Sequence, residues 1–62
     1  MSTHVAIVDD HFAVRLGMKY LVHEWMPEST IHLAKNLSEL FHILSSGRID
    51  IIVLDINIPG GK

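Results

Sequence analysis

Residues 49–61 read Ile-Asp-Ile-Ile-Val-Leu-Asp-Ile-Asn-Ile-Pro-Gly-Gly. Four consecutive apolar residues, Ile51 to Leu54, run directly into the carboxylate of Asp55. An unbroken run of this kind is typical of a strand that is covered on both faces, as in a parallel sheet. The Pro-Gly-Gly sequence that follows ends any strand or helix. We therefore predict that Asp55 lies at the carboxyl end of a strand, the edge at which open α/β sheets bind their ligands.

A single Asp after an apolar strand often only begins a turn, so a second acidic feature is needed before a binding site can be inferred. The apolar run His4–Val8 ends in the paired carboxylates Asp9 and Asp10. If the two strands lie side by side and parallel, three carboxylates meet at one edge of the sheet. Two such charges about 4 Å apart repel by about 4 kcal/mol at an effective dielectric constant near 20. A cation or a bound proton has to offset this repulsion, and the oxygen ligands favour Mg²⁺ bound together with a phosphate.

Length and composition limit the class of protein. The chain has 62 residues, 48% of them hydrophobic, and a net charge of −2, which indicates one small globular domain and argues against a nucleic-acid-binding surface. The absence of cysteine excludes disulfides and thiolate sites. The five histidines contain no i, i+4 pair, so a zinc site is not expected. No signal peptide and no apolar run of about 20 residues is present, and we expect a cytoplasmic protein without membrane contact.

The remaining pattern predicts two helices and one further strand. Apolar residues recur at helical spacing from Phe12 to about Trp25, and Pro27 ends this stretch. Residues 30–34 are less apolar and predict a short strand at a sheet edge. The side chains of the first helix expected to face the core are Val14, Met18, Leu21 and Trp25, with Val22 beside them.

A second amphipathic helix follows the predicted edge strand. Ser38 is the expected N-cap and Gly47 the expected C-cap. The order of elements is therefore β-α-β-α-β, which predicts an α/β fold with a parallel sheet and right-handed crossovers. The apolar stripe of this second helix is expected to consist of Leu37, Leu40, Phe41 and Leu44.

These features resemble the receiver domains of bacterial two-component response regulators. The pair Asp9-Asp10 follows the first strand, and the motif Asp-x-Asn-x-Pro-Gly runs from Asp55 to Gly60. The sequence Asp-Asp-His, followed by Val-Arg-Leu-Gly-Met from Val14, is most similar to the NarL/LuxR type. The resemblance implies a flavodoxin-like, doubly wound parallel sheet, truncated to β-α-β-α-β, with strand order 2-1-3; the full order 2-1-3-4-5 is that of a chemotaxis member of this family.

The resemblance also implies a site and a partner. Asp55 accepts a phosphoryl group from a phosphohistidine of a sensor histidine kinase in such domains. Asp10, Asp55 and the backbone carbonyl of Asn57 then bind Mg²⁺, while Asp9 acts mainly through water. A metal held by neighbouring acids offsets the charge of the phosphoryl oxygens, which a carboxylate nucleophile requires. The implied role is that of a phosphoacceptor and not of an enzyme.

The resemblance covers residues 1–62 as the N-terminal half of one receiver domain. The family's switch Ser/Thr and its phosphate-binding Lys come later in the domain, and Lys62 lies too early to take that role. We therefore expect the chain to be part of a longer regulator that controls transcription, in which only an absent C-terminal domain binds DNA. For the 62 residues themselves we expect a homo-oligomer, because the third strand leaves an open apolar edge.

The sequence leaves three other readings to weigh. A haloacid-dehalogenase-like phosphohydrolase requires a second Asp two residues after the nucleophile, where this chain has Asn57, and leaves the first acidic pair unexplained. A nucleotide-binding P-loop ending in Gly61-Lys62 requires glycine in place of Ile56. The third alternative is an interaction module that pairs with another chain and takes part in no phosphoryl transfer.

Overall fold

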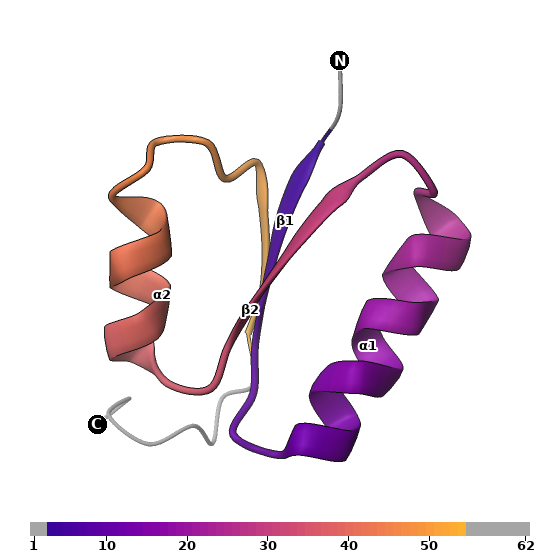
Figure 1. The fold of residues 1–62 in the computed structure, drawn as a ribbon, viewed down its shortest axis with the longest axis horizontal. Helices are drawn as coiled ribbons and strands as arrows, with labels where there is room; N and C mark the ends of the chain where they lie inside the picture. Colours follow the sequence, from indigo (N-terminus) through magenta and orange to yellow (C-terminus); the bar gives the residue numbers. More distant parts are fainter. Residues whose placement is uncertain (1–2, 55–62) are drawn as a thin grey trace.

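The central strand of the fold is β1 (His4–Val8). In the computed structural model, which describes residues 3–54, β1 lies between β2 (Thr30–Ala34) and β3 (Ile51–Leu54) (Figure 1). Both neighbours run parallel to β1, so the sheet has the order β2-β1-β3. The predicted fold class, strand order and edge position of β2 are thus confirmed.

Two helices cover opposite faces of this sheet, α1 (Phe12–Trp25) and α2 (Leu37–Leu44) (Figure 1). Successive side chains of a strand point to opposite faces, so β1 supplies alternate residues to two core clusters. The cluster under α1 contains Val5, Ile7 and Val22, and the cluster under α2 contains Ala6, Val8, Ala34 and Leu40. Within residues 3–54, no helix is long and apolar enough to cross a membrane.

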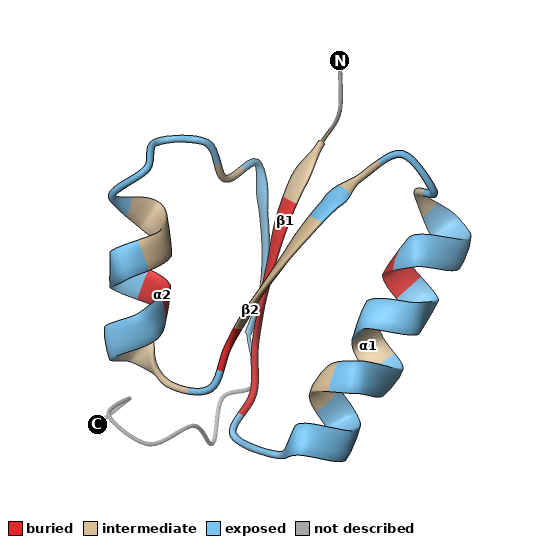
Figure 2. Ribbon diagram, viewed as in Figure 1, coloured by how far each residue is buried: buried red, intermediate tan, exposed pale blue. Residues whose placement is uncertain are grey.

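Burial is concentrated in β1 and not in β3. Val5 to Val8 are at most 1% exposed, and Figure 2 shows this strand as the buried centre of the molecule. By contrast, Ile51, Ile52 and Leu54 are 40–49% exposed. The prediction that the third strand is covered on both faces is therefore wrong for the described residues, because both helices pack over β1 and β2.

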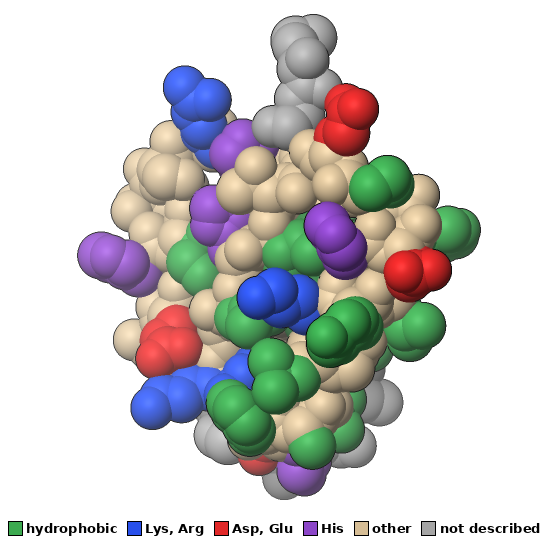
Figure 3. All heavy atoms as spheres, turned by 45° about the vertical axis from the view of Figure 1, so that its right-hand side comes forward, with side chains coloured by type: hydrophobic (Ala, Val, Ile, Leu, Met, Phe, Trp, Pro, Cys, Tyr) green, Lys and Arg blue, Asp and Glu red, His purple; other side chains and the backbone are tan. Residues whose placement is uncertain are grey.

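The buried face of α1 also differs from the predicted one. Trp25 is 83% and Leu21 is 71% exposed, and Val14 is exposed as well. The helix instead turns Val22 to the sheet, with Met18 packed beside it. Apolar residues occur around most of the circumference of α1, so their periodicity alone did not select one face. Figure 3 shows apolar side chains on the outer surface of this side of the molecule.

The ends of α2 are formed by other residues than those predicted. Asn36 is the N-cap, and its side-chain oxygen accepts a hydrogen bond of 2.8 Å from the N–H of Glu39, so Ser38 lies inside the helix. Ser45 is the C-cap. Gly47 comes two residues later with φ of +75°, a conformation that favours glycine.

One residue of the predicted α2 stripe faces solvent. Phe41 is 62% exposed, whereas Leu40, its neighbour in sequence, is buried under the helix. Two adjacent residues of a helix differ by about 100° in direction, so only one of them can point at the sheet. Leu37 and Leu44 pack against the same core cluster, as expected.

Candidate metal and phosphoacceptor site

The carboxyl ends of β1 and β3 lie at the same edge of the sheet. The register pairs Val8 with Leu54, the last residue of each strand. The two strands therefore end level with each other, which is the arrangement that the acidic residues of the sequence predicted. Asp55 and Asn57, the predicted phosphoacceptor and metal ligand, lie outside the described residues.

Asp9 is held firmly at this edge. Its backbone N–H donates a hydrogen bond of 3.0 Å to the carbonyl of Ala34, which extends the pairing of β1 with β2 by one residue. The residue is only 4% exposed. Its Oδ1 atom accepts hydrogen bonds from the backbone N–H of His11 at 2.8 Å and faces the Nδ1 atom of that ring at 2.9 Å. A buried carboxylate requires donors of this kind.

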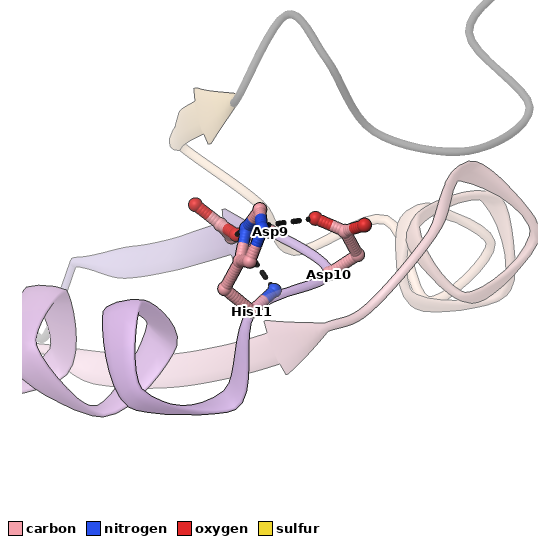
Figure 4. A group of neighbouring side chains, drawn as sticks. All are labelled: Asp9, Asp10 and His11. Atoms are coloured by element: carbon pink, nitrogen blue, oxygen red, sulfur yellow. Dashed lines mark hydrogen bonds and ion pairs between the residues drawn. The ribbon is translucent and has the colours of Figure 1, made fainter.

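Asp10 lies beside Asp9 with its side chain 33% exposed. Its Oδ1 atom is 3.0 Å from Nδ1 of His11, so one ring nitrogen lies between the two carboxylates (Figure 4). One ligand atom from each of the three residues lies within 4.8 Å of the other two. The structure thus brings together the two predicted acidic residues and adds His11, which was not among the predicted site residues.

Arg15 forms a hydrogen bond to the loop that carries Asp9, Asp10 and His11. Its Nη1 atom donates a hydrogen bond of 2.8 Å to the backbone carbonyl of Asp9, and its guanidinium lies 5.6 Å from the centre of the Phe12 ring. Its backbone N–H donates to the carbonyl of His11 at 2.9 Å. A positive charge therefore lies close to the acidic pair. The only signal for this role in the sequence was the proximity of Arg15 to Asp-Asp-His.

The donor set of this site fits Mg²⁺. Asp9 and Asp10 offer carboxylate oxygens, the ligands that this small, hard cation prefers, and protein sites for Mg²⁺ use one or two carboxylates together with waters and substrate phosphates. The buried side chain of Asp9 and the more exposed one of Asp10 leave the pair open on one side to solvent. These two residues would hold the ion at the edge where β1 and β3 end.

Comparison with known proteins agrees with the fold. The sequence profile of the response regulator receiver domain matches residues 5–62, and the chain belongs to this family. No curated protein and no solved structure gives a match. Membership indicates a phosphoacceptor role in two-component signalling, with a histidine kinase as the general kind of partner, and receiver domains typically bind Mg²⁺ at an acidic cluster. The resemblance inferred from the motifs is confirmed at the level of the family, while the NarL/LuxR type stays a prediction.

Proposed function

We propose that this chain takes a phosphoryl group from a sensor histidine kinase onto Asp55, with Mg²⁺ bound by Asp9, Asp10, Asp55 and Asn57. The observation that carries the proposal is the register of β1 and β3, which end level at Val8 and Leu54. The residue that follows each of these ends in sequence is an aspartate. Parallel strands that end together bring the residues after them to one ligand-binding edge.

The transfer forms one bond and breaks another. A carboxylate oxygen of Asp55 bonds to phosphorus, and the bond from phosphorus to the histidine nitrogen of the kinase breaks. The electron pair of the broken bond stays on the imidazole, and the product on this chain is an acyl phosphate. When bound, Mg²⁺ offsets the negative charge of the phosphoryl oxygens. The backbone N–H of Asp9 donates to the carbonyl of Ala34, and Arg15 donates to the carbonyl of Asp9; these two bonds keep the acidic loop in place.

The proposed consequence is a change of charge at the edge of the sheet. Phosphorylation of an aspartate adds about −1 to −2 units of charge there, which is enough to bias a loop between two arrangements. In a longer regulator of the NarL/LuxR type, this change controls transcription through a DNA-binding domain outside these 62 residues. The chain is then a phosphoacceptor and not itself an enzyme.

The test is phosphorylation of the Asp55→Asn variant with acetyl phosphate and Mg²⁺, followed by mass spectrometry of the intact protein. Asp55→Asn removes the nucleophilic oxygen, so we expect complete loss of the added phosphoryl group. Asp50→Asn is the matched control, since Asp50 precedes β3 at the opposite end of the strand, and this variant should label as the wild type does. Labelling of Asp55→Asn at the wild-type level contradicts the proposal.

A second function is favoured by the exposed apolar residues of α1 and β3, among them Trp25 and Ile52. In that case the chain is an interaction module that pairs with a second protein chain and accepts no phosphoryl group. NMR spectra recorded while beryllofluoride and Mg²⁺ are added distinguish the two functions. A phosphoacceptor shows shifts at Asp10 and Asp55, whereas an interaction module shows none.

A further inference from the structure

We propose that the ring of His11 is an internal competitor for the metal ion, which occupies the carboxylates of Asp9 and Asp10 until Mg²⁺ displaces it. The inference rests on the proposed function, because it concerns the regulation of the same site. It assigns to His11 the role of setting how much Mg²⁺ the receiver needs before the acidic pair becomes available.

The position of the ring nitrogen carries the inference. Nδ1 of His11 is 2.9 Å from Oδ1 of Asp9 and 3.0 Å from Oδ1 of Asp10 (Figure 4). A nitrogen at this distance from two carboxylate oxygens donates its hydrogen to them, and the neutral ring with its hydrogen on Nδ1 and the charged ring both supply that donor. The N–H group therefore relieves the repulsion between the two carboxylates, which is otherwise the task of a cation.

Mg²⁺ and this ring N–H group cannot both occupy the position between the two Oδ1 atoms. Mg²⁺ binds oxygen at about 2.1 Å, so an ion shared by both Oδ1 atoms takes the space into which the Nδ1 hydrogen points. The ion and the hydrogen also repel each other, because both carry positive charge. Binding of the ion thus requires the ring of His11 to leave the carboxylates.

The bonds that fix the loop and the start of α1 at His11 come from its backbone and not from its ring. The side chain is 66% exposed, and although His11 is the N-cap residue of α1, its side chain makes no capping hydrogen bond. Its backbone N–H donates to Oδ1 of Asp9, and its carbonyl accepts from the N–H of Arg15. Neither of these two bonds involves the ring, so both can remain when Mg²⁺ displaces it.

The competing possibility is that His11 is itself a metal ligand, since its ring nitrogen lies within reach of the same ion as the two carboxylates. The two roles make opposite predictions for a variant without the ring. Removing a competitor strengthens Mg²⁺ binding, whereas removing a ligand weakens it. Measurement of the dissociation constant therefore decides between them.

The experiment compares Mg²⁺ titrations of the wild type and His11→Ala, followed by the NMR shifts of the Asp9 and Asp10 amides. We expect the dissociation constant for Mg²⁺ to fall by about two- to tenfold in His11→Ala, the range that corresponds to loss of one competing hydrogen bond. His23→Ala is the matched control, since His23 is an exposed histidine of the same helix, and it should bind as the wild type does. In the wild type, the ring resonances of His11 should shift as Mg²⁺ binds.

A second variant guards against a loss of folding in His11→Ala. His11→Ser removes the ring and provides a preferred N-cap side chain for α1, and it should also bind Mg²⁺ more tightly than the wild type. An unchanged or larger dissociation constant in both variants overturns the inference while leaving the metal site in place. If neither the wild type nor any of the variants binds Mg²⁺, the proposed function and this inference both fail.

Discussion

At the scale of single residues, we expect the paired carboxylates of Asp9 and Asp10 to strengthen Mg²⁺ binding and to lower the stability of the metal-free protein. Asp10→Asn removes one charge of the pair, so we expect weaker Mg²⁺ binding. Without Mg²⁺, the free energy of unfolding should be unchanged or higher by up to about 1 kcal/mol, because repulsion from Asp9 is relieved at a partly exposed position. Urea denaturation and a Mg²⁺ titration measure the two effects. Glu28→Gln, a change at an exposed carboxylate outside the site, is the control, and a less stable Asp10→Asn protein contradicts the argument.

Arg15 should stabilise the loop from β1 to α1 through one hydrogen bond. Arg15→Met removes the bond to the carbonyl of Asp9 and keeps most of the length and helix propensity of the side chain. We expect the free energy of unfolding to fall by about 1 kcal/mol, since the lost bond has a charged donor and a partly exposed site. Lys19→Met, one turn further along the same helix and exposed, is the control and should change the free energy of unfolding much less. Equal effects of the two changes would mean that the bond to Asp9 contributes nothing.

At the scale of elements, α2 depends on its first turn because the helix has only eight residues. The side chain of Asn36 accepts from the N–H of Glu39, and the side chain of Glu39 accepts from the N–H of Lys35, each at 2.8 Å. Asn36→Ala should therefore lower the free energy of unfolding by about 1 kcal/mol. Chemical denaturation measures this loss. Ser38→Ala tests the alternative cap, and a larger loss in Ser38→Ala than in Asn36→Ala would contradict the observed helix start.

The sequence was sufficient to predict the elements because each has its own period and its own boundary. Four apolar residues of β1 end at Asp9, and α1 ends just before Pro27. It was not sufficient to predict which face of α1 is buried, since Leu21 and Val22 are both apolar and only the position of the sheet distinguishes them. The contacts in the loop between β1 and α1 could not be predicted from the sequence either.

For the candidate site, the sequence predicted the acidic residues of the first loop but not their partners. Asp9 and Asp10 follow an apolar strand, and this pattern has a direct chemical interpretation. The contacts of His11 and Arg15 depend instead on how the loop turns, two and six residues after Asp9. The periodicity of apolar residues does not determine the conformation of this loop, so its side-chain contacts could be identified only from the structure.

At the scale of the whole molecule, the outer edge of β3 should bring two copies of the 62-residue chain together. Among residues 3–54, β3 pairs only with β1, so its other edge presents backbone groups that a further strand can pair with. A second copy supplies an identical edge, and a twofold axis there sets the two strands antiparallel. Beside this edge, a hollow of about 440 Å³ is lined almost wholly by apolar side chains, from Met18, Leu21, Val22, Glu24, Trp25 and Val53.

The two α1 helices lie on the same face of such a joined sheet, so each can cover the apolar hollow of the other. We expect sedimentation at low micromolar concentration to show a dimer or a larger symmetric assembly. Trp25→Lys places a charge in the hollow and should shift the chain to the monomer, without cost to the core, because Trp25 is 83% exposed. Tyr20→Lys is the matched control: Tyr20 is 74% exposed on the same helix but does not line the hollow. A wild-type chain that is folded and monomeric at these concentrations contradicts the prediction, and so does a dimer that both changes weaken equally.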